Sequence, residues 1–397
     1  MKKYILLSLS FSFVAILAFV AAKNPSIQAF LPAPVPSDSP LVLRADAPGD
    51  LPVSNKKHKI QIALLLDTSN SMDGLIEQAK SQLWKLVNEL ALVKKEKEAA
   101  GIEIALYEYG NDGLSAHSGY VRQVAPLTTD LDFISQHLFS LRTNGGQEYC
   151  GWAMKDGLEN LRWSENGGDL KLIVIAGNEP FNQGSVDYKT VCKAAGQRGI
   201  CINTIFCGDY QEGVSTFWKD GADCACGTYT NINHNDVVQH IPTPYDQRVA
   251  ELNSRLNDTY IQYGAAGEEK KANQSRQDSN AAAYGDANTR TRSFFKSKEQ
   301  YKNSDWDLVD KAEEDEAVLQ NTEDLPAEMK AMDKDERKAY VEKKKAERTA
   351  IQKELLELEQ KVNEYIAKER QQSAEKLTLD NVMVTSLKKQ AKEKGFE

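Results

Sequence analysis

The 397-residue sequence predicts an α/β fold: a doubly wound, mostly parallel, Rossmann-like sheet, followed by a charged helical region or coiled coil. Near-continuous apolar runs such as KIQIALLLD and LKLIVIAG are typical of strands buried on both faces of a parallel sheet. Stretches of helix length separate these runs, as in a sheet covered by helices on both faces. After Pro326 the chain is charged and free of glycine and proline to about residue 372, which predicts a long helix.

The first 56 residues are predicted to lie outside the sheet domain. A short basic start precedes an uncharged apolar run that ends in small residues, which predicts an export signal over 1–22 with Ala22 the last residue removed. The run is also just long enough to span a bilayer, so an uncleaved membrane anchor is the alternative. Residues 23–56 hold seven of the twelve prolines and predict an extended linker. In either case the body of the protein is exported, to the periplasm or the extracellular space.

Residues 57–263 are predicted as the sheet domain, because apolar runs of strand length alternate with amphipathic stretches of helix length. The predicted order is strand 59–67, helix 75–90, strands 102–110 and 120–127, helices 131–141 and 149–163, strand 170–177, helix 187–197, strand 199–208, short helix 213–220, strand 227–233 and helix 245–263.

The chain after residue 263 carries fewer large apolar groups. Residues 264–325 are predicted as a partly helical linker, and residues 326–397 as a charged helical region. Apolar residues within that region alternate at spacings of four and three over about two heptads, which is the pattern of a coiled-coil seam. The seam consists of Ile351, Leu355, Leu358, Val362 and Tyr365. It predicts self-association through this helix, and the alternative is a solvated helix that folds back on the domain.

Charge excludes two classes of partner. The net charge is -9, and basic residues are mixed with acidic ones, which argues against a nucleic-acid or anionic-membrane binder. Contact with a membrane is therefore expected only through the N-terminal segment, if that segment is retained.

The six cysteines predict disulfides, since an even count in an exported chain favours bridges over free thiols. Cys150 and Cys207 are both expected at the same rim of the sheet, and they are the favoured pair. A zinc site built from Cys224 and Cys226 with His234, and with His240 as an optional fourth ligand, is the alternative, although C-x-C is not a standard zinc spacing.

A cluster of oxygen-bearing side chains follows the first predicted strand. Asp67 ends this strand, and Ser69 and Ser71 lie on the turn into the next helix. Ligands of doubly wound sheets bind beyond the carboxyl ends of the strands. A carboxylate with two hydroxyls supplies the hard oxygen ligands that Mg²⁺ or Ca²⁺ takes, so a divalent-cation site is predicted. The alternative is that these residues only cap the helix.

These residues carry a resemblance to a known family. DTSNS resembles the D-x-S-x-S motif of von Willebrand factor type A domains, TNGGQEYCGWAM resembles their glycine-rich second loop, and LIVIAGNEP resembles their fourth-strand loop. More narrowly, YEYGNDG, NGGQEYCG, IAGNEPF and WKDGA resemble an exported bacterial subgroup. The resemblance implies the type A fold and a metal-ion-dependent adhesion site, at which a carboxylate of a partner protein completes the bound cation.

The sequence departs from the family pattern in two of the three loops. Gln147 and Glu148 stand where members usually have threonine, and Gly177 and Asn178 stand within the usual T-D-G. A modified cation site is therefore predicted, in which nearby glutamates replace the lost charge. Its predicted ligands are Asp67, Ser69, Ser71, Glu148 and Glu179, supported by Asp112, Gln147 and Asn178.

The predicted function is an exported, non-enzymatic binding domain that acts in adhesion or envelope assembly. Its partner would be a protein with an exposed carboxylate, or a surface polymer. One alternative is a metal-independent scaffold that acts through the C-terminal helix. Another is a phosphatase-like hydrolase with Asp67 as nucleophile, although Ser69 stands where haloacid-dehalogenase-like enzymes carry a second aspartate.

Overall fold

The computed structural model describes residues 57–233, 241–370 and 379–397. The predicted export signal, the predicted linker over 23–56 and His234 and His240 of the zinc alternative lie outside these ranges. Within them, no helix is both long and apolar enough to cross a bilayer.

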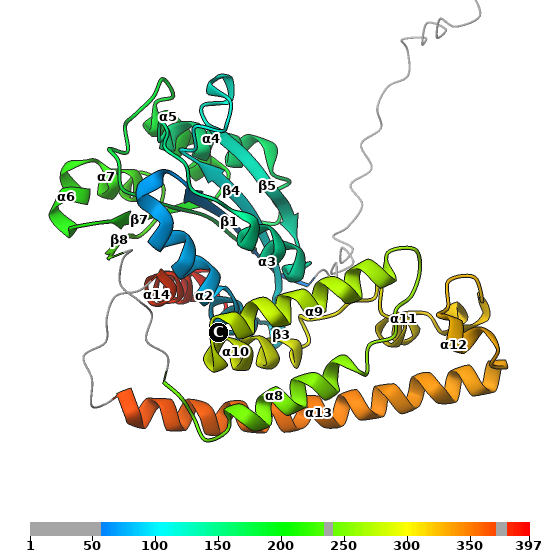
Figure 1. Cartoon of the computed structure of the whole chain (residues 1–397). Coiled ribbons are helices and arrows are strands. Elements are labelled where there is room, and N and C mark those ends of the chain that lie inside the picture. The colour runs from blue at the N-terminus through cyan, green and yellow to red at the C-terminus, as the bar shows by residue number, and fades with distance from the viewer. Residues whose placement is uncertain (1–56, 234–240, 371–378) are drawn as a thin grey trace, which may run out of the picture. The chain divides into compact units, whose positions relative to one another are not determined.

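Six strands form one sheet in the order β5-β4-β1-β6-β7-β8 (Figure 1). Their bounds are β1 (Lys59–Asp67), β4 (Gly101–Tyr109), β5 (Val121–Thr128), β6 (Leu170–Gly177), β7 (Cys201–Cys207) and β8 (Tyr229–Ile232). Every neighbouring pair in this sheet is parallel except β4 and β5, so the predicted mostly parallel sheet is confirmed. The winding reverses beside β1, because the chain crosses first to β4 and later to β6. A separate hairpin of β2 (Lys94–Lys95) and β3 (Glu98–Ala99) was not predicted.

Helices cover both faces of the sheet (Figure 1). One face packs against α2 (Asp73–Ala91), α3 (Leu131–Ser140) and α14 (Leu379–Glu393), and the other against α4 (Cys150–Asn160), α5 (Tyr188–Gln197) and α7 (Trp218–Asp223). Alternate residues of a strand point to opposite faces, so Ile62 and Leu64 join the first layer and Ala63 and Leu65 the second. The predicted helix over 213–220 is in fact two, α6 (Tyr210–Ser215) and α7, separated by Phe217 with φ of 71°.

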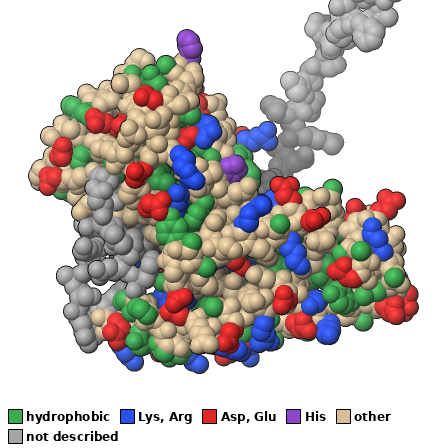
Figure 2. Space-filling model, in the orientation of Figure 1, with side chains coloured by type: hydrophobic (Ala, Val, Ile, Leu, Met, Phe, Trp, Pro, Cys, Tyr) green, Lys and Arg blue, Asp and Glu red, His purple; other side chains and the backbone are tan. Residues whose placement is uncertain are grey.

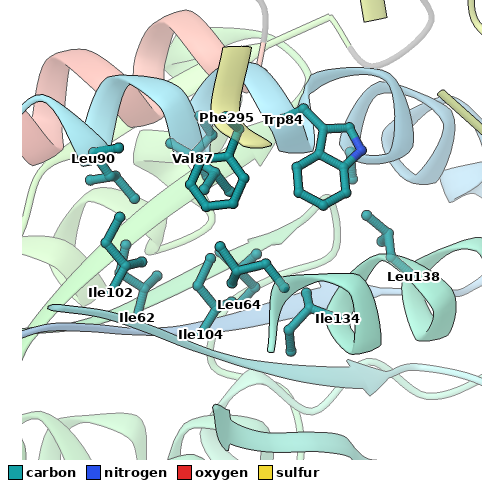
Figure 3. Packing of buried hydrophobic residues seen from close by; sticks show 14 of the residues in the cluster. Ile62, Leu64, Trp84, Val87, Leu90, Ile102, Ile104, Ile134, Leu138 and Phe295 are labelled. Atoms are coloured by element: carbon teal, nitrogen blue, oxygen red, sulfur yellow. The ribbon is translucent and has the colours of Figure 1, made fainter. Parts of the chain in front are cut away.

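The larger core lies between the sheet and α2 (Figure 3). Trp84 and Phe295 meet there with ring centroids 5.8 Å apart, above Ile62 and Leu64 of the central strand. Each such buried side chain contributes roughly 1.5–3 kcal/mol relative to its exposed state. Phe295 comes from far along the chain, so the C-terminal half completes the core of the sheet domain.

The region after β8 is helical and packed. Its helices are α8 (Asp246–Asn257), α9 (Gly267–Ala283), α10 (Asp286–Lys296), α11 (Leu308–Glu314), the 3₁₀ helix η4 (Glu316–Gln320), α12 (Ala327–Lys330), α13 (Lys334–Arg370) and α14. Two short 3₁₀ helices, η2 (Asn70–Met72) and η3 (Ala116–Ser118), lie earlier, within the sheet domain. Residues 264–325 were predicted as a partly helical linker. They are helical as predicted, but they are not a linker, because α10 contacts α2 and α8 and buries Phe294 and Phe295. Its polar residues are buried as ion pairs: Arg292 binds Asp132 of α3 and Asp278 of α9.

The apolar seam of α13 faces its own chain. Ile351, Leu355, Leu358 and Val362 are buried in the larger core, where α13 contacts α8, α10 and α11. Arg348 fixes the helix further, since its Nη1 lies 2.7 Å from both Asp307 and Asp310. The fold-back alternative is therefore observed, and the predicted self-association through this seam is wrong. Figure 2 shows acidic and basic side chains interspersed along the face that α13 forms.

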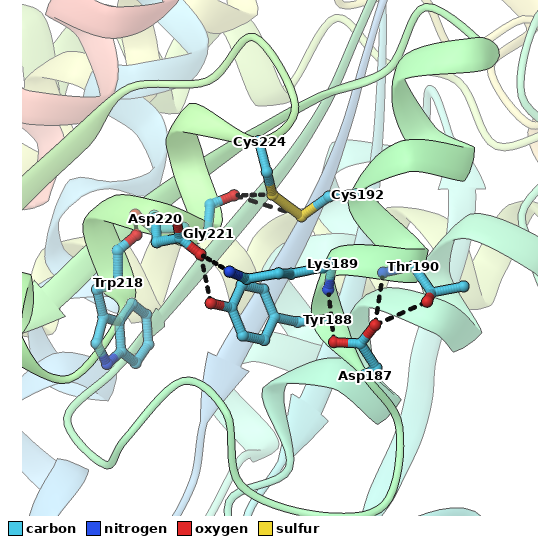
Figure 4. The surroundings of a disulfide bond; sticks show 10 residues. Asp187, Tyr188, Lys189, Thr190, Cys192, Trp218, Asp220, Gly221 and Cys224 are labelled. Carbon is cyan, nitrogen blue, oxygen red and sulfur yellow. Dashed lines mark hydrogen bonds and ion pairs between the residues drawn. A yellow bond between two sulfur atoms is a disulfide. The ribbon is translucent and has the colours of Figure 1, made fainter.

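Two disulfides bind the segment after α7 to earlier elements of the sheet domain. Cys192 of α5 pairs with Cys224 (Figure 4), and Cys201 of β7 pairs with Cys226. Bridges of this kind indicate an oxidising compartment. The predicted pair of Cys150 and Cys207 is wrong, and both are free and buried. Cys150 packs in the layer of α4 and Cys207 in the layer of α2, so the sheet itself separates the two thiols.

Candidate functional site

Strand register places three residues in one row at the carboxyl edge of the sheet. Asp67 of β1 pairs with Tyr109 of β4, and the pairing of Leu66 with Ala176 places Gly177 of β6 on its other side. All three residues lie on the side of the sheet that α4 covers. Each follows by two residues a member of that buried layer, namely Leu65, Tyr107 or Ile175, and every second residue of a strand points to the same side. The row lies where the winding reverses, which is the ligand-binding position of this class of fold.

Asp67 is fully buried at the centre of the row. Its Oδ1 accepts a hydrogen bond of 2.7 Å from the backbone N–H of Ser69, whereas its Oδ2 has no partner among the described residues. The Oγ atoms of Ser69 and Ser71 lie 3.3 Å apart, and Asn178 donates to Ser71 across 3.3 Å. Ser69 precedes η2 but makes no side-chain capping bond there, so helix capping does not explain the hydroxyls.

Glu148 reaches Asp67 because two glycine backbones approach closely. Gly110 has φ of 78°, and a Cβ there would lie 2.8 Å from both Asp67 Oδ1 and Glu148 Cγ. A Cβ on Gly146 would overlap the carbonyl of Gly110. Asn144 donates its N–H to Thr68 across 2.9 Å, which ties the loop to the first turn. The absence of side chains at Gly110 and Gly146 therefore allows Glu148 to lie beside Asp67.

Asp67 and Glu148 form a buried pair of carboxyl groups. Glu148 is 6% exposed, it lies close enough to Asp67 for each group to shift the pKa of the other, and Glu148 Oε2 has no partner among the residues that the structure describes. Burial raises the pKa of Glu148 to about 9, and the charge of Asp67 adds to this shift. Burial likewise raises the pKa of Asp67 to about 6, against hydrogen bonds that lower it. Without a bound cation, the pair therefore holds a proton at neutral pH.

Tyr109 occupies the space beside Gly177. Its hydroxyl donates to the carbonyl of Ala176 across 2.9 Å, and a Cβ on Gly177 would overlap this hydroxyl and lie 3.1 Å from Asp67 Oδ2. Residue 177 consequently has no room for a carboxylate. Tyr109 was not among the predicted site residues, although its place at the end of the second predicted strand, beside Asp67, was a usable signal.

The other predicted residues lie at the rim. Glu179 is exposed and accepts from Gln183 across 3.1 Å, although its charge still raises the pKa of Asp67 and Glu148. Asp112 and Gln147 are exposed on loops at the same edge. The structure thus brings together Asp67, Ser69, Ser71, Glu148 and Asn178, and leaves Asp112, Gln147 and Glu179 around them.

The converging donors fit a small divalent cation. Three buried oxygens, Asp67 Oδ2, Glu148 Oε2 and Asn178 Oδ1, have no hydrogen-bond partner among the described side chains and backbone. Carboxylate, hydroxyl and amide oxygens are the ligands that Mg²⁺ and Ca²⁺ prefer. In the described ranges no three His, Cys, Asp or Glu side chains are grouped to hold a metal, so two carboxylates would act with neutral oxygens.

Comparison with known proteins identifies the domain that carries this site. Residues 61–218 match the family model of the von Willebrand factor type A domain, a range that includes Asp67, Glu148 and Gly177. The search of curated proteins found no match.

Solved structures similar to the chain include three that cover 44% of it. They are the conserved hypothetical protein BatB from Bacteroides thetaiotaomicron (17% identity, 90% of that chain, TM-score 0.34), the SpRpn10 VWA domain (16%, 88%, 0.34) and an aerotolerance-related membrane protein from Bacteroides fragilis NCTC 9343 (18%, 93%, 0.30).

Proposed function

Since residues 61–218 are a von Willebrand factor type A domain, we propose that the chain is a non-enzymatic binding protein that engages a partner protein through a divalent cation. Asp67, Glu148, Ser69, Ser71 and Asn178 would hold the cation at the carboxyl edge of the sheet. The cation would supply an electrophilic point that accepts an oxygen of the partner.

The unpaired oxygens of Asp67 and Glu148 are the observation that carries this proposal. A buried polar atom without a partner costs about 1–3 kcal/mol, and more when it is charged, so two side by side need a compensating ligand. A proton satisfies one carboxyl group, whereas a divalent cation satisfies both and favours their ionised forms. Mg²⁺ and Ca²⁺ are the candidates, because all donors are oxygens.

The setting proposed for this binding is the cell exterior, in adhesion or envelope assembly. The two disulfides support an oxidising compartment, as does the export signal predicted from the sequence. The scaffold alternative loses its main support, because the apolar seam of α13 is buried against its own chain.

Binding from envelope extract tests the proposal. Full-length wild type, Asp67→Ala and the remote control Asp305→Ala are used as bait, with and without chelator, and calorimetry measures Mg²⁺ and Ca²⁺ binding. We expect wild type and the control to bind a cation and to lose their partner in chelator, and Asp67→Ala to do neither. A partner retained equally by all three baits in chelator, with no heat from either ion at millimolar concentration, would contradict the proposal.

A further inference from the structure

We infer that the partner group completing the coordination of the cation is a neutral oxygen, a hydroxyl or an amide carbonyl, and not a carboxylate. This inference rests on the proposed cation site. It departs from the carboxylate partner that the family resemblance implies, and the reason is the charge that this chain itself supplies.

Two carboxylates already balance a divalent cation. Asp67 and Glu148 contribute one negative charge each, and the remaining donors, Ser69, Ser71 and Asn178, are neutral. With both carboxylates ionised the site has no net charge, so an incoming anion gains much less attraction than it would at a site with a net positive charge. It would also lose more hydration than a neutral group on entering the site.

The surroundings of the site do not favour an anion. Asp112 and Glu179 are exposed at the rim, and both repel an approaching carboxylate. Two basic side chains near this edge are already engaged. Arg122 pairs with buried Glu108, and Arg142 donates to the carbonyls of Phe139 and Leu141.

Glu148 cannot readily leave to make room for a carboxylate of the partner. Its carbonyl accepts from Cys150 N at the start of α4, and its Cγ packs against Gly110 where a side chain would not fit. Only 6% of the residue is exposed. Glu148 therefore belongs to the fixed ligand set.

The mouth of the site suits a neutral polar group. Asn70 and Ser71 are exposed there, and Asn178 beside them keeps an unpaired Oδ1. Hydroxyl and amide groups both donate and accept hydrogen bonds, as a partner hydroxyl or amide would require.

The test asks whether acetate, the simplest carboxylate, strengthens cation binding. The full-length chain is titrated calorimetrically with Mg²⁺, and separately with Ca²⁺, in chloride and in acetate buffers of equal ionic strength at about 200 mM salt. Wild type is compared with Glu148→Gln, which removes one charge, and with the exposed control Glu165→Gln.

We expect acetate to leave the dissociation constants of wild type and Glu165→Gln within about twofold. In Glu148→Gln, cation affinity in chloride should fall about tenfold or more, and acetate should restore about threefold or more, since the site then has a net positive charge. Acetate that strengthens wild-type binding as much as it strengthens the variant overturns the inference and leaves the cation site intact. Absence of cation binding by wild type in every buffer overturns the cation site, and this inference with it.

Discussion

Replacing Glu148 by glutamine should stabilise the cation-free protein at neutral pH. The carboxyl group has a pKa of about 9 in the folded chain against 4.5 for the unfolded group, so the folded state binds more protons between these values. Its contribution to stability is therefore highest below pH 4.5 and is lost as pH rises toward 9. A pH of about 7 lies about 2.5 units above the unfolded pKa. At 1.36 kcal/mol per unit, the carboxyl group therefore lowers the free energy of unfolding at that pH by about 3 kcal/mol. Glutamine keeps the hydrogen-bond donor and removes this loss.

Urea unfolding in chelator, with the disulfides intact, measures the effect. At about pH 7 we expect the free energy of unfolding of Glu148→Gln to exceed that of wild type by up to about 3 kcal/mol. At about pH 5 the difference should be less than about 1 kcal/mol. Glu165→Gln should stay within about 0.5 kcal/mol of wild type at both pH values. Added Mg²⁺ or Ca²⁺ should stabilise wild type and narrow the gap. A variant less stable than wild type, by an amount independent of pH, would refute the reasoning and make Glu148 an ordinary packing residue.

Four further outcomes are expected. Gly177→Ala should lower the free energy of unfolding in urea by about 1–3 kcal/mol, because the added methyl group meets the Tyr109 hydroxyl. In a Tyr109→Phe background the same substitution should cost less, and equal costs in both backgrounds would contradict the contact. Leu355→Ala should lower the free energy of unfolding by about 2–5 kcal/mol without changing the sedimentation coefficient. If the substitution instead dissociates an oligomer, the helix forms an intermolecular coiled coil. Arg292→Met should cost about 3–5 kcal/mol, since two buried aspartates lose their shared partner, and a neutral effect in thermal unfolding would show that they relax. Mass spectrometry of the exported protein should find Ala22 as the last residue removed, and an intact N-terminus would indicate an anchor.

The sheet and the first loop of the site were predictable because their signals are local. The central strands β1 and β6 are near-continuous apolar runs, and Asp67, Ser69 and Ser71 lie within five residues. The placement of Glu148 beside Asp67 depended on a loop 80 residues away, and its resemblance to a known loop supplied that expectation. The position of Tyr109 beside Asp67 depends on the register of β1 and β4. It could have been predicted by aligning the ends of the two predicted strands.

The helical character of the chain after residue 263 was predicted, but the packing of residues 264–325 against the sheet domain was missed because burial there is polar. Arg292 and Lys296 are almost completely buried, yet a hydropathy pattern assigns both to solvent. Their two charges are balanced by the carboxylates of Asp132 and Asp278. Burial alone would raise the pKa of Asp278, yet Lys296 and Arg292 hold it well below its usual range because they stabilise the ionised form. Paired charges of this kind become visible only once the partner helices are known.

Disulfides were predicted and two are present, but the favoured pair was wrong for a different reason. Cys150 and Cys207 were placed at one rim, but a rim has two faces. Along β7, Ile205 and Cys207 face α2 whereas Ile202 and Phe206 face the layer that holds Cys150. The two-residue period of β7 assigns Cys207 to the face that α2 covers, whereas Cys150 lies on the other face because α4 packs there.

The C-terminal helices and the site belong to one folding unit. α2 begins at Asp73, directly after the turn that carries Ser69 and Ser71, and its buried side packs on α10 and α14. A chain that ended at residue 263 would expose the surface of Trp84 and Val87 that Phe295 and its neighbours now cover. Without these packing partners α2 would be held less firmly, and so would the first loop, which leads into it. The matched family range of 61–218 consequently contains the candidate site, whereas the folded unit that holds this site extends to the C-terminal helix.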